Sequence, residues 1–375
     1  MATAKMAEAA NGIGRIAAAF DAARDEGRAA LMPYMMGGFP DLETSAALID
    51  AYADTGADLI ELGVPYSDPL ADGPVIHAAA TEALAAGTRF GDVMTLCERV
   101  SARVPVLPMV YVNVVLTLGP DRFAATLERA GAAGAIIPDL PPGEDDSIAE
   151  ALIERGLAPI GFVAPTTAPE RLRAIAAAAT GFTYVVSLTG VTGERAEVPP
   201  ELAALVGAVR ESSPAPAAVG FGIGTPEHAA TVGEMADGVI IGTRLVRAVA
   251  DAGGREEAVD AVRSFLADTR VALAAFSGAA AGAVVCFLVN KYWAFRDHTP
   301  LSLRQVGSFG VVAVGTALLM AAAMQVVVVG MGVPYLLAKL LCAAVVFAVW
   351  SYPAQRQLVF RRPVLVEPEA ASSMA

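Results

Sequence analysis

The chain has few charged residues and few aromatic ones. Only 17% of its 375 residues are Asp, Glu, Lys or Arg, only 6% are aromatic, and the mean hydropathy is +0.54. This composition is too apolar for a disordered chain and for an ordinary soluble enzyme. The net charge of −13 has the opposite sign to that of general nucleic-acid-binding proteins, so we expect no nucleic-acid partner.

Cysteine and lysine are scarce, and this excludes several kinds of site. The three cysteines, Cys97, Cys286 and Cys342, lie far apart, so we expect neither a disulfide framework nor a cysteine-built metal site. The part of the chain before residue 271 contains one lysine, Lys5, in the N-terminal tail. A Schiff-base aldolase needs a buried lysine amine, so that chemistry is excluded. A carbon–carbon bond cleavage would therefore have to use carboxylates and tyrosines.

Histidine is scarce as well. The same part of the chain contains only His77 and His228, with no cysteine nearby in the sequence, so we expect no histidine-rich zinc site and no metal. No G-x-G-x-x-G motif follows a first strand, so nothing indicates a dinucleotide site. No long apolar run follows Met1, so we expect no signal peptide.

The charge is divided unevenly near residue 270. Residues 1–270 carry 19 basic and 36 acidic side chains, whereas residues 271–375 carry seven and three, so the two parts have net charges of −17 and +4. We therefore expect an acidic globular domain at 1–270, an apolar segment at 271–363 and a disordered tail at 364–375.

Three stretches of the apolar segment have the length of a membrane-crossing helix, which needs about 20 apolar residues. They are Val271–Asn290, Val306–Val329 and Pro334–Tyr352. Buried helices of a soluble domain are the alternative, but three such runs with little amphipathic pattern argue against it. We expect an all-α transmembrane segment of about three helices, and hence a lipid bilayer as a partner.

In the acidic domain, short β-rich runs alternate with alanine-rich helical runs. Strands are predicted at Leu31–Met36, Asp58–Leu62, Val106–Val110, Ala135–Pro138, Pro159–Val163, Thr183–Ser187, Ala217–Phe221 and Gly238–Ile241. Helices are predicted at Leu42–Thr55, Asp121–Ala132, Glu170–Ala179 and Pro226–Gly233, among others. Eight such units in about 250 residues are typical of a TIM barrel of the α/β class. A doubly wound open sheet is the alternative, but it more often has five or six strands.

In a TIM barrel the chemistry lies at the carboxyl ends of the strands. Glu61 lies near the end of the second predicted strand, and Asp72 lies in the loop that follows. Burial there would raise the pKa of Glu61 and suit it to proton transfer near neutral pH. Helix capping or loop bracing is the alternative role for such an acid, and we favour it for Asp68 but not for Glu61.

Small residues follow three neighbouring strands. They are found at Gly190 to Gly193, at Gly220 to Gly224 and at Gly242-Thr243. Glycine lets backbone N–H groups approach an anion, and the turns after the last two strands are the usual phosphate site of this fold. Turns need glycine in any case, but three such turns together indicate a small phosphorylated substrate.

One sequence signature is more specific. Residues 59–74 read LIELGVPYSDPLADGP, and this run resembles the signature of the tryptophan synthase alpha chain family. The resemblance continues through residues 109–113, 138–141, 184–187, 190–193, 220–222 and 242, and it covers roughly residues 12–268. It implies a TIM barrel and a lyase of L-tryptophan biosynthesis, which cleaves indole-3-glycerol phosphate to indole and glyceraldehyde 3-phosphate by a retro-aldol reaction.

The resemblance also implies the roles of individual residues. Glu61 would be the acid and base that protonates the indole carbon, and Asp72 would accept or stabilise the proton of the indole nitrogen. Three aromatic residues would line the indole pocket, namely Tyr111, Tyr184 and Phe221. Four residues would hold the phosphate, namely Gly193, Gly222, Gly242 and Thr243. The family usually has Gly-Ser where this chain has Gly242-Thr243, so the hydroxyl is kept.

The resemblance implies a partner as well. Alpha chains of this family dock on a β chain that carries pyridoxal phosphate, in an α2β2-type complex. The loop Pro65–Pro69 would lie on the docking face. We expect no cofactor in this chain itself, and a cytoplasmic catalytic domain.

The C-terminal segment resembles a second family. The run from Phe287 to Arg296, FLVNKYWAFR, is similar to the end of the second membrane helix of GtrA-like proteins, which are thought to move polyprenyl-linked sugars across membranes. The resemblance covers about residues 272–362, and the family's first helix is missing. We therefore expect a lyase with a membrane-embedded extension. The alternative is a GtrA-like translocation protein with a non-catalytic barrel; a metal-dependent epimerase is disfavoured because ligand histidines are absent.

Overall fold

The structure is a computed structural model that describes residues 11–141, 143–186, 200–220, 222–294, 302–324, 327, 342 and 344–359. Its internal contacts divide the chain into two compact units, Met1–Gly278 and Ala279–Ala375. This division falls slightly later in the chain than the boundary that the charge pattern places at residue 270. The expected tail at 364–375 lies outside the described residues.

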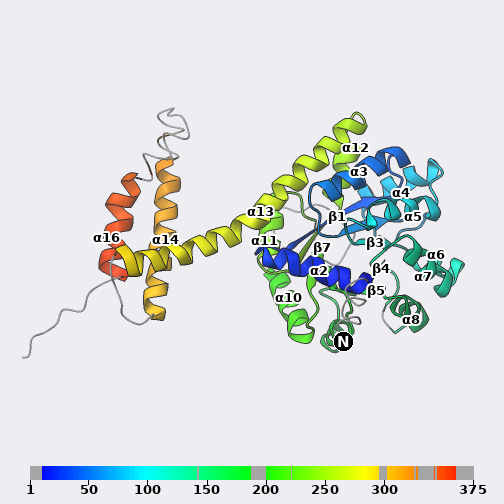
Figure 1. Cartoon of the computed structure of the whole chain (residues 1–375), viewed down its shortest axis with the longest axis horizontal. Coiled ribbons are helices and arrows are strands. Elements are labelled where there is room, and N and C mark those ends of the chain that lie inside the picture. Colours follow the sequence, from blue (N-terminus) through cyan, green and yellow to red (C-terminus); the bar gives the residue numbers. More distant parts are fainter. Residues whose placement is uncertain are drawn as a thin grey trace, which may run out of the picture. The chain divides into compact units, whose positions relative to one another are not determined.

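Eight parallel strands close into a barrel in the first unit (Figure 1). The strands follow one another in sequence order, and the last pairs with the first. They are β1 (Ala30–Met36), β2 (Ile60–Gly63), β3 (Val106–Met109), β4 (Gly134–Ile136), β5 (Ala158–Val163), β6 (Thr183–Val186), β7 (Ala217–Gly220) and β8 (Gly238–Ile241). The expected TIM barrel is confirmed, and the open sheet is excluded because the barrel is closed.

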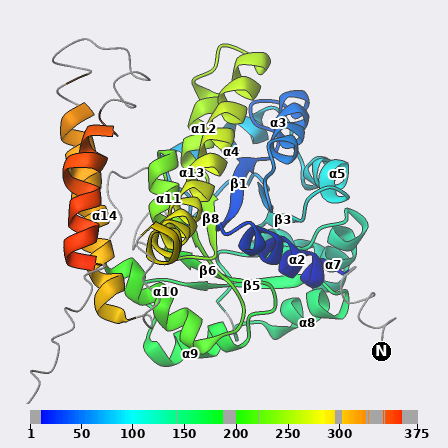
Figure 2. The same cartoon turned by 60° about the vertical axis from the view of Figure 1, so that its left-hand side comes forward.

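Helices surround the barrel (Figure 2). They are α2 (Gly12–Asp25), α3 (Leu42–Asp54), α4 (Pro74–Ala85), α5 (Phe90–Ser101), α6 (Val112–Leu118), α7 (Pro120–Arg129), α8 (Asp146–Glu154), α9 (Pro169–Ala177), α10 (Pro200–Ser212), α11 (Pro226–Gly233), α12 (Thr243–Ala250) and α13 (Arg255–Val289). Many begin at residues that favour a first turn. Asp41 caps α3 by accepting a hydrogen bond from the Thr44 N–H at 2.7 Å, and proline starts α4, α7, α9 and α11.

The inner side chains at the amino ends of the strands pack against α2. Ile16 and Phe20 of this helix belong to the same buried cluster as Met32 and Leu59 from the strands. A Cβ at Gly238 would lie 2.9 Å from the Phe20 ring, so glycine leaves room for that ring. The inside of the barrel at its amino end is therefore filled with apolar side chains.

Helix α13 runs from the carboxyl end of the barrel strands to their amino end. At its start, Arg255 forms an ion pair of 2.6 Å with Glu43, which follows β1. Near the unit boundary, Arg270 donates a hydrogen bond of 2.6 Å to the Gly56 carbonyl, just before β2. The chain thus leaves the first unit at the end of the barrel away from the mouth.

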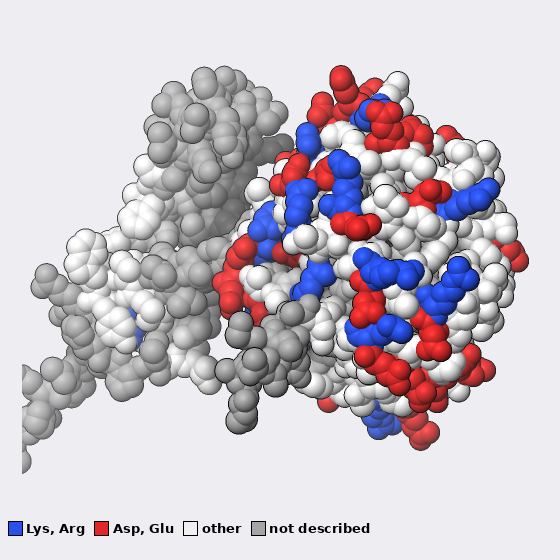
Figure 3. Space-filling model, turned by 45° about the vertical axis from the view of Figure 1, so that its right-hand side comes forward, with Lys and Arg blue, Asp and Glu red and all other residues white. Residues whose placement is uncertain are grey.

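Basic and acidic side chains are interspersed on the surface of the first unit. Figure 3 shows basic and acidic side chains next to one another on one face of the barrel. Pairs such as Arg99 with Asp50 at 2.7 Å and Arg210 with Asp237 at 2.8 Å are of this mixed kind. The basic side chains drawn on that face thus have acidic neighbours, and a surface of this kind does not favour one sign of charge in a partner.

The described part of the second unit is helical. It comprises the end of α13, η1 (Asn290–Ala294), α14 (Leu303–Met324), η3 (Phe347–Ser351), α16 (Tyr352–Ala354) and η4 (Gln355–Val359). Phe287, Val312, Ala354 and Val359 form its buried cluster. A polar group lies beside this cluster, since Lys291 donates to Gln305 at 3.1 Å and Asn290 donates to Gln355 at 2.8 Å.

The three expected membrane crossings are only partly visible. Val271–Asn290 is helical almost throughout as the second half of α13, and Val306–Val329 overlaps α14, whereas most of Pro334–Tyr352 lies outside the described residues. Among the residues that the structure describes, no helix has both the length and the apolar character needed to cross a membrane.

Candidate active site

Glu61 lies on β2, two residues before the carboxyl end of the strand, inside the barrel. Its Cα is paired in register with that of Tyr34 on β1 and with that of Leu107 on β3. The residue is only 2% exposed, and its Oε2 atom is buried without a hydrogen-bond partner in the described part of the chain. Burying a carboxyl oxygen without a hydrogen-bond partner costs free energy. The stability of the fold therefore does not explain why a glutamate occupies position 61.

Asp72 is brought to the same place by the loop between β2 and α4. The hydroxyl of Tyr111 hydrogen-bonds to the Asp72 side chain and accepts a hydrogen bond of 3.2 Å from the Ala71 N–H. The Tyr111 ring stacks on Tyr66 with centroids 5.1 Å apart, and Asn113 donates to the Tyr66 hydroxyl at 2.8 Å. These contacts hold the loop against the residues that follow β3.

The environment of the two carboxyl groups separates their protonation states. Removal from water, and then the charge of Asp72, raise the pKa of Glu61 to about 8. Burial raises the pKa of Asp72 to about 6, against the opposing effects of the Tyr111 hydrogen bond and His77. At neutral pH, Glu61 is therefore mainly protonated and Asp72 mainly ionised. One acid and one carboxylate in the same mouth are the arrangement that acid–base catalysis requires.

Two tyrosines, Tyr34 and Tyr184, complete the polar end of the barrel. Tyr184 on β6 stacks on Phe162 of β5 with centroids 4.8 Å apart, and burial together with the charges of Glu61 and Asp72 raises its pKa. Tyr34 on β1 is 5% exposed, and the same causes raise its pKa. Tyr34 was not among the predicted site residues. Its position in the second half of β1 could have indicated a site residue. An aromatic residue in an apolar strand is, however, more often part of the hydrophobic core.

The turn after β8 has the geometry of an anion site. Gly242 precedes the first turn of α12, and Thr243, 7% exposed, begins the helix. The positive end of the α12 dipole and its first N–H groups therefore lie at the carboxyl end of β8. Gly222, with a φ of +21°, follows β7 on the neighbouring strand. The predicted phosphate residue Gly193 and the predicted indole residue Phe221 lie outside the described residues.

Possible metal ligands are scattered over the barrel. In the described segments, no group of three or more His, Cys, Asp or Glu residues is placed to hold a metal ion.

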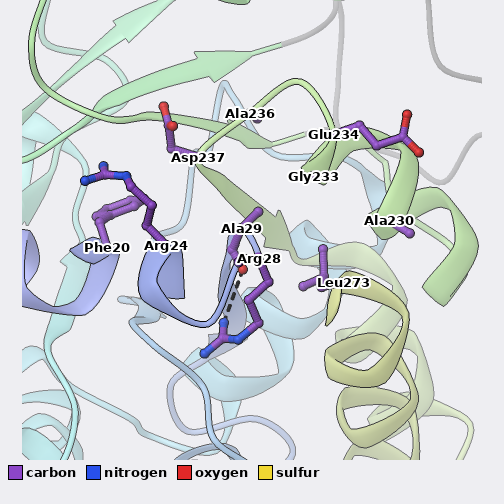
Figure 4. Close-up of a pocket in the computed structure, with 11 residues that line it drawn as sticks. Phe20, Arg24, Arg28, Ala29, Ala230, Gly233, Glu234, Ala236, Asp237 and Leu273 are labelled. Atoms are coloured by element: carbon purple, nitrogen blue, oxygen red, sulfur yellow. Dashed lines mark hydrogen bonds between the residues drawn. The ribbon is translucent and has the colours of Figure 1, made fainter. Parts of the chain in front are cut away.

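A cavity of about 190 Å³ lies at the amino end of the barrel (Figure 4). Two of its charged side chains serve the fold: Arg28 donates to Asp58 at 2.5 and 2.9 Å, and Asp237 accepts from Arg210. The cavity is therefore separate from the polar end that holds Glu61.

The family of the barrel is settled by comparison with known proteins. A family model described as "Tryptophan synthase alpha chain" matches residues 20–274. The chain belongs to the tryptophan synthase alpha chain family. A tryptophan synthase alpha chain of Synechocystis is 44% identical over 261 residues, which are 69% of this chain and 98% of that protein. One from Gloeobacter violaceus is 46% identical over 246 residues, which are 65% of this chain and 89% of the relative.

Solved structures agree with this family assignment. A structure of Mycobacterium tuberculosis tryptophan synthase has a TM-score of 0.64 and 39% identity, and the match covers 69% of this chain and 98% of that one. The tryptophan synthase subunit alpha of Legionella pneumophila has a TM-score of 0.63 and 36% identity, over 69% and 98% of the two chains. The predicted lyase of tryptophan biosynthesis is confirmed.

A second family model, "GtrA/DPMS, transmembrane domain", matches residues 258–360. The resemblance expected from about residue 272 is thus confirmed, and the match already begins at residue 258. The two matches overlap at residues 258–274, all of which belong to α13. This helix packs on the barrel through Val262, Leu266 and Leu273, which are buried. The overlap is therefore part of the barrel.

Proposed function

We propose that Glu61 and Asp72 are the catalytic pair of a retro-aldol cleavage of indole-3-glycerol phosphate. Protonated Glu61 gives its proton to the indole carbon that carries the glycerol phosphate chain. The ring becomes an iminium ion, and the Asp72 carboxylate stabilises its N–H. The adjacent hydroxyl then loses its proton to the Glu61 carboxylate, the carbon–carbon bond breaks, and its electrons return to the ring. Indole and glyceraldehyde 3-phosphate result, and Glu61 is protonated again.

One observation carries this proposal: a carboxyl group that is protonated at neutral pH lies near one that is ionised, inside the same barrel mouth. The ring itself is the electron sink, so the reaction needs neither a lysine nor a metal. Tyr111 and Tyr184 would contact the indole ring. The phosphate would bind the N–H groups of Gly222, Gly242 and Thr243.

The direct test is the stoichiometry of the products. The full chain is incubated with indole-3-glycerol phosphate, and indole is measured together with glyceraldehyde 3-phosphate, the latter by a coupled dehydrogenase. Equal amounts of the two products are expected. Release of indole without the aldehyde, or of neither product, would contradict the proposed cleavage.

We further propose that the mouth of the barrel is the docking face for a tryptophan synthase β chain, which would carry the pyridoxal phosphate. Leu70 in the loop before α4 is 78% exposed, and Leu116 on α6 is 54% exposed. Both segments flank the stacked Tyr66 and Tyr111. Exposed apolar side chains beside a polar rim are typical of interaction surfaces.

For the extension, we propose attachment to the membrane with the barrel on the cytoplasmic side. The support is the match to a transmembrane family and the net charge of +4 beyond residue 270. Fractionation of cells tests this. The full chain is expected in the membrane fraction after a carbonate wash, and recovery in the soluble fraction would overturn the attachment. The alternative, sugar translocation with a non-catalytic barrel, is disfavoured because Glu61 and Asp72 are both in place.

A further inference from the structure

The side chain of Tyr34 extends across the barrel mouth beside Glu61. The Cα atoms of Tyr34 and Glu61 are partners in the β1–β2 pairing. A Cβ built on Gly63, the next inward position of β2, would overlap the Tyr34 hydroxyl. A Cβ built on Gly242 would lie 3.6 Å from the Tyr34 ring. The ring therefore reaches from the phosphate turn after β8 to the strand end that carries Glu61.

Glycines on both sides make room for the two phenols of the mouth. Gly63 accommodates Tyr34, and a Cβ at Gly220 on β7 would lie 2.5 Å from the Tyr184 hydroxyl. Side chains at either glycine would push the tyrosine rings away from Glu61. Behind β1, the Tyr52 hydroxyl donates a hydrogen bond of 3.2 Å to the Tyr34 carbonyl, which fixes the backbone of that strand.

Glu61 has apolar or aromatic neighbours on these strands and little access to water. Removal from water is the main reason for its raised pKa, ahead of the charge of Asp72. The titratable groups around it are Tyr34 on β1, Asp72 in the loop after β2, Tyr111 after β3 and Tyr184 on β6, with His77 on α4 acting on Asp72. Of these groups, Tyr34 lies on β1, the strand that pairs with β2 at Glu61. The side chains of Tyr34 and Glu61 are both buried.

We propose that Tyr34 is a positioning residue whose ring covers the Glu61 carboxyl in the barrel mouth and shields it from water. This rests on the proposed role of Glu61 as the acid of the cleavage. The aromatic ring performs the shielding, and the hydroxyl is not required for it. Tyr34 thus acts through Glu61 rather than on the reacting atoms.

The test is the pH profile of kcat/KM for the full chain and two variants. Tyr34→Ala admits water, so the pKa of Glu61 falls and the basic limb of the profile moves down by about one pH unit. At the pH where the wild-type kcat/KM has fallen to half its maximum, the kcat/KM of Tyr34→Ala should then be several-fold lower than that of the wild type. Tyr34→Phe keeps the ring, and its basic limb is expected to stay in place. A basic limb that Tyr34→Ala leaves unmoved would overturn the proposal, as would an equal shift in Tyr34→Phe.

A matched control separates shielding from general loosening of the barrel. Met32→Ala removes a buried side chain from the same face of β1, one inward position closer to the filled end. It is expected to lower stability but to leave the basic limb unmoved. A shift equal to that of Tyr34→Ala would contradict a specific role for Tyr34.

A second pair of variants tests the geometry. Gly63→Ala places a methyl group where the Tyr34 hydroxyl lies, so the ring must move and the basic limb should fall as in Tyr34→Ala. The methyl group would also lie 2.8 Å from the ring carbon Cζ, so the matched double variant is Gly63→Ala/Tyr34→Ala, in which the whole ring is gone and the limb is expected to lie where Tyr34→Ala places it. A further fall of the limb in this double variant would contradict the contact.

A direct titration of Glu61 distinguishes failure of this inference from failure of the proposed function. The carboxyl carbon signal of Glu61 is followed by NMR in the full chain and identified by its loss in Glu61→Gln. If the wild type releases no indole, the proposed function fails. The inference then stands or falls on whether Tyr34→Ala, unlike Tyr34→Phe, lowers the titration midpoint of Glu61.

Discussion

Glu61 and Asp72 influence each other through charge, and the burial of each sets which one keeps its proton. The pKa of Glu61 is raised to about 8 and that of Asp72 to about 6. Between these values the mouth of the barrel holds one neutral and one charged carboxyl group. The same functional group, a carboxyl, thus supplies an acid at Glu61 and a stabilising anion at Asp72, and the difference comes from exposure and hydrogen bonding.

A bell-shaped pH profile follows from this pair. The active form needs ionised Asp72 and protonated Glu61, so kcat/KM should fall below pH 6 as Asp72 gains a proton and above pH 8 as Glu61 loses one. Initial rates of indole formation between pH 5 and 9 measure this. A profile that stays flat from pH 5 to 9 would contradict the assignment.

Asp72→Asn should change both the rate and the pH profile. Loss of the carboxylate lowers kcat/KM by about 10²-fold or more, because the iminium N–H loses its counter-charge. The negative charge of Asp72 helps to raise the pKa of Glu61, so the basic limb should also move to lower pH. Asp68→Asn, an exposed acid in the same loop, is the control and should keep wild-type values. An Asp72→Asn variant with an unmoved basic limb would show that the two carboxyls are not coupled.

The strands and the acidic pair could be predicted from the sequence, because strands buried on both faces read as continuous apolar runs. The predicted strand Asp58–Leu62 is β2 at Ile60–Gly63, which starts two residues later and ends one residue later and still contains Glu61. Tyr34 could not be singled out, since its role depends on the β1–β2 register and on its reach over Gly63. Closure of β8 on β1 is likewise a property of the folded barrel.

The phosphate site is tested by placing a charge in it. Gly242 has a φ of −110°, and a Cβ there would make only ordinary contact with Tyr34, so Gly242→Asp should fold. Repulsion of the phosphate should raise KM by about tenfold or more. Gly91→Asp, where a Cβ has open space in the first turn of α5, is the matched control. Equal KM values for both variants would place the phosphate elsewhere.

The stability of the barrel depends on a buried ion pair at its other end. Arg28, whose side chain is 1% exposed, pairs with Asp58, which also accepts a hydrogen bond of 2.7 Å from the Leu31 N–H. Asp58→Asn leaves the buried guanidinium with only the exposed Glu26 carboxylate, at 2.8 Å, and should lower the free energy of unfolding by about 3 kcal/mol. Asp21→Asn removes an exposed pair with Arg24 and should cost at most about 1 kcal/mol. Urea unfolding of both variants compares them, and equal losses would refute the importance of the buried pair.

The role of Glu61 as the acid is tested most directly by indole release from indole-3-glycerol phosphate by the full chain and by Glu61→Gln. Glutamine keeps the shape but cannot give up a proton, so the rate should fall by about 10²-fold or more while the barrel stays folded. Glu82→Gln, an exposed acid on α4, should retain the wild-type rate. A Glu61→Gln variant as active as the wild type would contradict the account.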